Sequence, residues 1–528
     1  MTYKAFRLYT WLPVLAVALL GGCATSRSPW MDRKGEGAHK LPPAVLEGVE
    51  EDSGEERSTA GVISNDAAVV RLSVEEAVLM ALEHNASFRV DRLSPGIVET
   101  REREALAAFD PVVSANAYQG DVQVGTNEIT GSDAAGAGVG LRKSLATGTT
   151  LDAGGTRAPA SGSVPPSTSY DVQLTQSLLQ GFGPAANLAS VRQARLDTLI
   201  SAYELRGVAE ALVAQVEGVY WDHMLAERSI AIYEESLKIA EQQIAEAQKR
   251  IRIGSMAETE LTAAEAELAS RRERLIDARS ESAKSRLTLL RLVNQSGGDA
   301  LGREVELTDL PELSGQEGLD DVRAHVALGL KQRADLNQAR LAVTRGEIEV
   351  VRTRNGLLPK LDLFIRLGGT RYAEAFSSMS SDEWSREAQA GLLFEYPLGN
   401  RAERASHDRA KLSLEQARGS LVNMKQLVEV DIRTAYLEVA RAQEQVSATE
   451  ATRKLREETL QTELEKLRVG KSTSLLVAQA SRDSVESRIA CVRAVIAYRK
   501  ALLDLYRLEG SLLERRGIQS ATGAAGMQ

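Results

Sequence analysis

The chain contains one long module twice. From Gly183 to Leu292, adding 216 to the residue number reaches a similar residue at almost every position without a gap. An earlier segment repeats with an offset of 248, which relates Pro111 to Pro359. A period of about 200 residues is too long for a solenoid, whose repeats run to about 20–50 residues. The duplication therefore predicts a pseudo-symmetric structural element, and nothing in the repeat has the pattern of an active site.

The first residues have the pattern of a secretory signal. A basic start precedes an apolar run over residues 8–20, which is shorter than the roughly 20 residues that a membrane-spanning helix needs. The run ends in Leu20-Gly-Gly-Cys23, which resembles a bacterial lipobox, where the signal is cut before a cysteine that receives lipid chains. We expect residues 1–22 to be a signal peptide and Cys23 to carry the lipid. Ordinary signal cleavage with an incidental cysteine is the alternative.

Composition argues against several kinds of site. The chain has 64 basic and 73 acidic residues, a mildly acidic balance that argues against a nucleic-acid surface. Its five histidines are scattered without the spacing of metal ligands. The string 136–140, Gly-Ala-Gly-Val-Gly, neither follows a strand nor opens a helix as a dinucleotide site requires. We therefore expect no nucleic-acid partner, no cofactor, no metal site and no enzymatic activity.

Helical periodicity dominates the rest of the chain. Apolar and small residues step alternately by three and four, the seam of a coiled coil, at Ile230, Tyr233, Leu237, Ala240, Ile244, Ala247 and Ile251. We place the first repeat at 72–318, with a helix, β-hairpins 111–180, a long helix 187–253, a tip, a return helix 258–294 and a break 295–318. The second repeat, 319–516, has a helix, a β-hairpin 359–398, a long helix 401–468, a tip and a return helix 474–513. Residues 23–71 are expected to be a flexible tether and 517–528 a loose tail.

The helix lengths suggest how the helices stack. At 1.5 Å per residue, the run 187–253 would be roughly 100 Å long and each return helix roughly 55 Å. Two half-length helices end to end therefore match one long helix. We expect 258–294 to stack on the helix at 319–355, and 474–513 to stack on the helix at 73–109. In the pattern of the second return helix, Cys491 is expected to be a small buried hydrophobe rather than a reactive thiol.

Short strand signals lie at the other end of the long helices. Apolar and polar residues alternate near 113–118, 172–175, 361–367 and 392–396. That alternation is typical of a half-buried strand and also of a membrane barrel wall, so a soluble sandwich remains open on this pattern alone. The first repeat has an additional segment around 138–155 with a turn at 146–148. We interpret it as an extra hairpin, and the pattern does not say whether it joins the barrel wall.

Several segments, in their order and duplication, resemble TolC-like outer membrane efflux proteins. The resemblance covers about residues 72–510. It rests on an opening helix at 72–85, a strand-to-helix passage at Leu174–Gly183, and two helix-turn-helix tips at Arg250–Gly254 and Leu467–Gly470. Proline or glycine stands at the helix–barrel junctions of that family, here Pro111, Gly183, Pro359 and Gly399.

The resemblance implies a mainly α fold with a small β part. Long antiparallel coiled-coil helices would form an α-barrel tunnel through the periplasm, topped by a 12-stranded transmembrane β-barrel of a homotrimer. Four strands, even with an extra hairpin, fall below the roughly eight of the smallest barrels. Open sheet edges cannot lie in lipid, so a spanning version of this sheet must be oligomeric.

The function implied by the resemblance is that of a passive conduit. The chain would be the outer-membrane channel subunit of a tripartite efflux or type I secretion system. Its partners would be a periplasmic adaptor (membrane fusion) protein, an inner-membrane pump of the RND or ABC type, and outer-membrane lipid. It would lie in the cell outer membrane, lipid-anchored, and extend into the periplasm. The alternative is a lipid-anchored periplasmic coiled-coil scaffold or adaptor, although an adaptor would normally show one helical hairpin flanked by small β domains.

Candidate site residues follow from the tips. The adaptor-docking tips are expected at Arg252, Gly254, Arg468 and Gly470, where glycine tolerates the positive φ of a tight reversal. Family members often carry acidic residues just past the second tip, but this chain has Leu476 and Gln479 there. In the first repeat Glu260 could supply an acidic ring of three at the tunnel entrance, or be a solvated helix residue. The sequence leaves open whether the gate is acidic or apolar.

Overall fold

The computed structural model describes residues 69–122, 132–159, 166–253, 258–293, 300–309, 319–372 and 384–518. All of them lie in one compact unit, Arg57–Ile518. The other unit consists of Met1–Glu56 with Gln519–Gln528. The expected signal peptide, Cys23 and most of the expected tail therefore lie outside the described residues.

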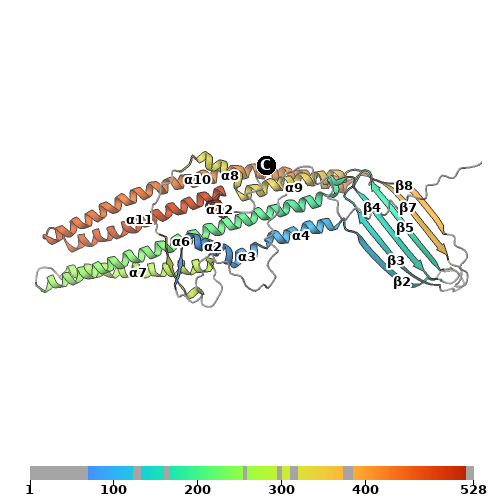
Figure 1. Cartoon of the computed structure of the whole chain (residues 1–528). Coiled ribbons are helices and arrows are strands. Elements are labelled where there is room, and N and C mark those ends of the chain that lie inside the picture. The colour runs from blue at the N-terminus through green and yellow to red at the C-terminus, as the bar shows by residue number, and fades with distance from the viewer. Residues whose placement is uncertain are drawn as a thin grey trace, which may run out of the picture. The chain divides into compact units, whose positions relative to one another are not determined.

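Two very long helices run through the unit, with shorter helices beside them (Figure 1). The first repeat contributes α2 (Val74–His84), α3 (Ala86–Asp91), α4 (Ser94–Ala107), α5 (Pro184–Asn187), α6 (Ala189–Arg252) and α7 (Glu258–Val293). The second contributes α8 (Val322–Gln332), α9 (Ala334–Gly356), α10 (Arg401–Arg468), α11 (Ser474–Glu509) and the short α12 (Leu512–Arg515). The duplication is visible in these bounds: α11 begins and ends 216 residues after α7, and α8 begins and ends 248 after α2.

Several of the shorter helices start where a side chain satisfies a free backbone N–H group. The Ser73 Oγ accepts a hydrogen bond from the Glu76 N–H at 3.2 Å, while the Glu76 carboxylate accepts from the Ser73 N–H at 2.9 Å. This reciprocal pair is a capping box. Its counterpart in the second repeat is Asp321, which caps α8 by accepting from Arg323 N–H. Thr473 caps α11 in the same manner. Local sequence therefore fixes where the half-length helices begin.

The half-length helices stack within each repeat. At the end of α7, the Leu292 carbonyl accepts a hydrogen bond from Asn85 Nδ2 between α2 and α3, at 2.9 Å. At the end of α11, Glu509 Oε2 lies 2.5 Å from His325 Nδ1 of α8. The expected stacking of 258–294 on 319–355, and of 474–513 on 73–109, was therefore wrong. Lengths alone fit both arrangements, but each return helix meets the half-length helix of its own repeat.

A small parallel sheet lies where the stacked helices of the first repeat meet. The strands are β1 (Val69–Leu72) and β6 (Glu304–Leu307), with Leu72 opposite Leu307. Leu72 is fully buried in a core cluster with Tyr220, whose hydroxyl donates to the Leu72 carbonyl at 3.0 Å. The end of the expected tether and part of the expected break are thus ordered strands. Two four-residue strands give too short a pattern to recognise.

The main sheet has six antiparallel strands in the order β2-β3-β4-β5-β7-β8. They are β2 (Val112–Val122), β3 (Ser132–Ser144), β4 (Thr149–Ala158), β5 (Ser167–Ser177), β7 (Lys360–Tyr372) and β8 (Ser385–Glu395). The extra hairpin is β3–β4, and it lies inside the sheet between β2 and β5 (Figure 1). The fold class is confirmed: long antiparallel helices, a smaller antiparallel sheet and an internal duplication. The expected barrel of 12 strands assumes four strands from each of three chains, but this chain supplies six.

The strand register places apolar side chains on one face of this sheet. Residues in mutual register on successive strands form an apolar row of Val113, Leu141, Ala153, Val172, Leu367 and Ala388. The row on the opposite face, one residue along, begins with Val112 on β2 and is polar on the other five strands: Arg142, Asp152, Gln173, Arg366 and Gln389. Many apolar-face residues are exposed, among them Val113, Val139, Ile365, Leu392 and Phe394. An exposed apolar area of this extent indicates contact with lipid or protein.

None of the helices in the described ranges combines the length and apolar character needed to cross a membrane.

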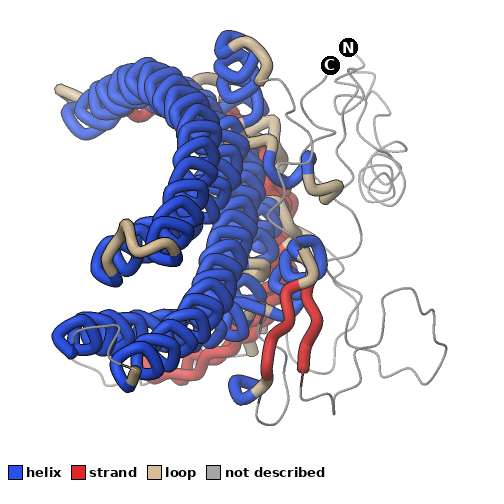
Figure 2. The backbone as a smooth tube through the Cα atoms, turned by 90° about the vertical axis from the view of Figure 1, so that its left-hand side faces the viewer, coloured by secondary structure: helices blue, strands red, loops and turns tan. Residues whose placement is uncertain are grey.

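In Figure 2 the long helices run roughly along the line of sight, and most of the strands lie behind them. The two helix tips therefore lie at the end opposite the main sheet, as Figure 1 also shows.

Candidate functional site: the helical tips and the entrance

Each tip lies between two coiled-coil helices, α6 and α7 at the first and α10 and α11 at the second. At the second tip, Gly470 has φ of 77°, the left-handed conformation expected for a glycine at this turn. Its N–H donates to the Leu467 carbonyl at 3.1 Å, and the Lys471 N–H donates to the Lys466 carbonyl at 2.8 Å. These bonds close the end of α10. At the first tip, α6 ends at Arg252, and Gly254 lies outside the described residues.

Both expected tip arginines lie on the surface. Arg252 and Arg468 are the last residues of α6 and α10, and both are exposed. Arg468 Nε lies 3.3 Å from Glu465 Oε2 on the same helix, and Arg252 Nε donates to the Gln248 carbonyl. Surface pairs of this kind contribute at most about 1 kcal/mol. Both guanidinium groups can therefore be drawn into contact with a partner at little cost.

A groove of about 380 Å³ lies between the two hairpins just behind the tips. All four coiled-coil helices line it, and its apolar residues include Ala240, Ala247, Ala264, Leu464, Leu467 and Val477. Ala240 and Ala247 belong to the seam expected from the sequence and are buried. Small seam residues let the α6–α7 pair pack closely.

One buried arginine ties the two hairpins together near the tips. Arg271 of α7 donates through Nη1 to the carbonyl and hydroxyl of Ser236 on α6, at 2.8 and 2.9 Å. Its Nη2 donates to the Ser481 hydroxyl of α11 at 3.0 Å, and its Nε donates to Glu267 at 3.2 Å. Arg482 of α11 also donates to Glu267, at 3.1 Å. We call this group the Arg271 latch: Arg271, Glu267, Ser236, Ser481 and Arg482.

Sequence reasoning missed the latch. Charged residues are almost never fully buried unless they are paired, yet the Arg271 side chain is only 5% exposed. One usable signal is that the duplication relates Arg271 to Ser487, so a charge stands in one repeat where the other has a small residue. A second is the i,i+4 spacing of Glu267 and Arg271, which lets the two pair on one helix.

The expected entrance residues occupy the first turns of the return helices. Leu476 is the third residue of α11 and is 47% exposed. Gln479, one turn further on, is also exposed. Glu260 is likewise the third residue of α7, and its side chain lies outside the description. Leu476 and Glu260 therefore occupy equivalent positions in the two repeats, each in the first turn of a return helix.

The expected helix–barrel junctions lie at the other end of the helices. Pro111 and Pro359 directly precede β2 and β7. Gly183 and Gly399 have φ of 87° and 99°, so both lie in the region that favours glycine. Near these positions the two repeats are joined by backbone hydrogen bonds, including Leu178 N–H to the Leu361 carbonyl at 2.7 Å.

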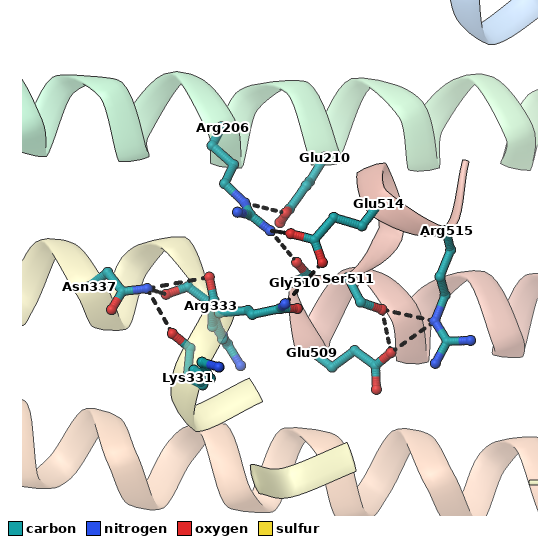
Figure 3. Close-up of polar contacts among 11 residues, drawn as sticks. Arg206, Glu210, Lys331, Arg333, Asn337, Glu509, Gly510, Ser511, Glu514 and Arg515 are labelled. Carbon is teal, nitrogen blue, oxygen red and sulfur yellow. Dashed lines mark hydrogen bonds and ion pairs between the residues drawn. The ribbon is translucent and has the colours of Figure 1, made fainter. Parts of the chain in front are cut away.

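A buried polar network joins the helices where the half-length helices meet (Figure 3). Arg206 of α6 donates to Glu210 at 3.0 Å and to the Gly510 carbonyl at 2.6 Å, and lies 3.4 Å from Glu514. Burial raises the pKa of the Glu210 carboxyl, although Arg206 beside it acts in the opposite direction. Glu509, which meets His325, also accepts from Ser511 and Arg515. The network fixes α12 against α6.

Neither metal chemistry nor thiol chemistry is indicated in this part of the chain. Within the described ranges, no three His, Cys, Asp or Glu side chains are placed to hold a metal ion. Cys491 is half-buried and donates its Sγ–H to Glu450 at 3.3 Å. Burial, and then the neighbouring Glu450 carboxylate, raise the pKa of this thiol. A protonated thiol is a poor nucleophile.

Long coiled coils joined to a sheet with one exposed apolar face define a channel protein that combines a helical tunnel with a β-barrel. A model of the outer membrane efflux protein family matches residues 134–295 and 327–511. The chain belongs to this family. It is an outer membrane channel of the kind that serves tripartite efflux systems, located in the outer membrane and extending into the periplasm. The family consists of channel proteins rather than enzymes.

Solved structures share the fold. The Vibrio cholerae outer membrane protein VceC has 15% identity over 84% of this chain and 97% of its own, with a TM-score of 0.61. The Campylobacter jejuni CmeC channel has 14% identity over 83% and 86%, with a TM-score of 0.63. The Neisseria gonorrhoeae MtrE channel, in its open state, has 17% identity over 83% and 89%, with a TM-score of 0.62. No curated protein sequence matches the chain. Identities this low carry the fold and not the cargo.

Proposed function

We propose that three copies of this chain form one continuous passive conduit from the periplasm to the outside. The carrying observation is the division of the chain into helices that end in two tips and, at the opposite end, a sheet with one exposed apolar face (Figure 1). The 68 residues of α10 extend about 100 Å at 1.5 Å per residue. The apolar face would contact lipid while the helices reach into the periplasm.

Closure of the sheet by further copies is favoured because the sheet is open, and the number three is taken from the resemblance to TolC-like proteins. Among the described strands, the edge strands β2 and β8 pair on one side only. Backbone groups without partners cost several kcal/mol each in lipid. Detergent-extracted chains should therefore run as trimers that dissociate only on heating. A monomer released by salt alone would contradict the proposal and favour the scaffold alternative.

We place the adaptor contact at the tips, with an inner-membrane pump of the RND or ABC type supplying the energy. Arg252, Gly254, Arg468 and Gly470 would form the docking surface. Val469, beside Gly470, is 62% exposed, so Val469→Trp adds bulk without disturbing a core. Export should be lost while trimers still assemble. Ala448→Trp, on the exposed side of α10 away from the tip, is the control for a bulky residue on the same helix. Normal export by Val469→Trp would contradict docking at this tip.

The lipid anchor and the gate complete the proposal. Cys23 would be the acylated N-terminus, which mass spectrometry of the mature protein tests directly. At the entrance, Glu260 from three copies would form an acidic ring, with Leu476 between them and Gln479 one turn deeper. Charges interact over about 8–10 Å at physiological salt, so the ring acts only if the entrance is narrow. Glu260→Gln should lower cation selectivity; if instead only Leu476→Ala raises conductance, the gate is apolar.

A further inference from the structure

We propose that the barrel of the assembled channel has 18 strands, six from each of three copies, closed by pairing β8 of one copy with β2 of the next. This inference rests on the proposed trimer and concerns the width of its outer end. Its support is that the hairpin β3–β4, which has no counterpart among the described strands of the second repeat, is part of the wall.

The hairpin separates β2 from β5 along their length. On one side β3 pairs with β2 from Val112↔Arg142 to Val122↔Ser132. On the other side β4 pairs with β5 from Thr149↔Gln176 to Ala158↔Ser167. A hairpin folded over the sheet or into the lumen would leave β2 beside β5. Here β2 is connected to β5 through the β2–β3, β3–β4 and β4–β5 pairings instead.

The hairpin also continues both faces of the wall. Leu141 and Ala153 stand in the apolar row between Val113 of β2 and Val172 of β5. On the next row Val139 is 61% exposed on the same face. A strand of a membrane barrel alternates between an apolar lipid face and a polar lumen face. A hairpin surrounded by water would have no reason to keep this alternation in register with its neighbours.

The polar face of the hairpin matches the rest of the lumen side. Arg142 donates from Nε to Asp152 across the β3–β4 pair, at 2.5 Å, within the polar row. Tyr118 of β2 covers Gly136 of β3, since a Cβ on that glycine would lie 2.7 Å from the ring. Phe364 of β7 covers Gly391 of β8 in the same way. The same cross-strand aromatic–glycine contact therefore holds the inserted hairpin and the β7–β8 hairpin.

The edge strands β2 and β8 allow copies to join, and three copies with six strands each then give 18 strands. Strand direction alternates across the sheet, so β8 runs opposite to β2 and a second copy can continue the antiparallel order. Barrel diameter grows roughly linearly with strand number. An 18-stranded wall is therefore about 1.5 times as wide as a 12-stranded one, with about twice the cross-section. Barrels of 16–18 strands leave an open aqueous channel.

Disulfide mapping within the apolar row tests this inference in full-length trimers in outer membranes. In a Cys491→Ala background, the pairs Val113→Cys with Leu141→Cys and Ala153→Cys with Val172→Cys should oxidise within one chain. Val113→Cys with Val172→Cys is the control and should not, because three strand spacings separate these residues by about 14 Å, too far for a disulfide. Mass spectrometry of the linked peptides reads the pattern.

The outcomes separate the two proposals. Trimers that conduct but form the Val113–Val172 link overturn the 18-stranded wall and leave the proposed conduit intact. Chains with the expected links that remain monomeric in lipid overturn the trimer itself.

Removing residues 132–158 adds a measurement of width. Assembled trimers of this variant should admit neutral polymers from the outer side only up to about half the cross-section that the full chain admits. An unchanged polymer cut-off would overturn the wider wall. If the variant fails to assemble, the disulfide pattern in the full-length chain still decides.

Discussion

The Arg271 latch can be tested directly as the link between the two hairpins, because Arg272, the next residue on the same helix, serves as a control. Replacing Arg271 by Ala removes the hydrogen bond to Ser481 on α11 and both hydrogen bonds from Nη1 to Ser236 on α6. Glu267 keeps Arg482 as a partner at 3.1 Å, so no carboxylate is left buried without a cation. The lost link between the hairpins is therefore mainly the charged hydrogen bond to Ser481.

Its magnitude follows from that single bond. A hydrogen bond to a charged group contributes about 1.5–3 kcal/mol, and each 1.4 kcal/mol is a factor of ten in an equilibrium. We expect Arg271→Ala to shift the balance between docked and separated hairpins by about 10- to 100-fold. Arg272, also paired with α6 through Glu241 at 3.2 Å, has a side chain that is 59% exposed. Surface pairs contribute about 0–1 kcal/mol, so Arg272→Ala should change little.

Hydrogen exchange in detergent-solubilised trimers measures this balance. Amides in the first turns of α11 should exchange faster in Arg271→Ala by the same 10- to 100-fold factor, because local opening sets their rate. Amides of the β strands should be unaffected in both variants. Arg271→Lys should lie between the two, since a lysine supplies a charge without the planar fork that bridges three helices. Equal exchange in Arg271→Ala and Arg272→Ala would refute the latch.

Two further predictions concern the region where the half-length helices meet. Burial lowers the pKa of His223 to about 4, so the folded state holds this side chain neutral. Above the unfolded pKa near 6.5 the side chain is neutral in both states, and its burial then causes no loss of stability. Stability should fall as pH drops from 6.5 to 4, by up to about 3 kcal/mol; thermal melts of His223→Gln against pH should lack this component, and an unchanged slope would contradict it. Gly510 has φ of 73° and an added Cβ would lie 3.1 Å from the Arg333 backbone, so Gly510→Ala should cost more than about 1–2 kcal/mol. Gly419, in open space on α10, gives the control: Gly419→Ala should be neutral or stabilising in the same melts.

Patterns that one segment carries by itself could be predicted from sequence. The expected long helix 401–468 and return helix from 474 coincide with the observed starts of α10 and α11, because a cap such as Thr473 and a glycine such as Gly470 act locally. The extra hairpin was found for the same reason, since its turn at Gly148 is a local signal. Whether it joins the wall depends on pairing with β5, which the hairpin's own residues do not encode.

Features that depend on a remote partner could not be predicted. The predicted stacking of the half-length helices was wrong because stacking within a repeat and stacking between repeats give the same total length. Only contacts such as the hydrogen bond from Asn85 to Leu292 select one of them. The burial of Arg271 could not be predicted, because an arginine on a helix is usually solvated and this one is covered by α11 of the other repeat. β1 was missed because a four-residue strand is specified mainly by its partner β6.

The two repeats differ at the junction between the return helix and the half-length helix. Ala77 and Val293, both buried in one apolar cluster of the first repeat, correspond through the two offsets to His325 and Glu509 in the second. At this pair of positions one junction thus has an apolar contact and the other a buried polar pair 2.5 Å apart. Removing one partner of a buried pair is far more costly than trimming an apolar contact. The second repeat therefore adds a buried polar pair to its apolar core around Ile432, whereas the first repeat packs Ala77 and Val293 into an apolar cluster at the equivalent place. Substitution of His325 or Glu509 should for this reason destabilise the second repeat more than a conservative change of Ala77 or Val293 destabilises the first.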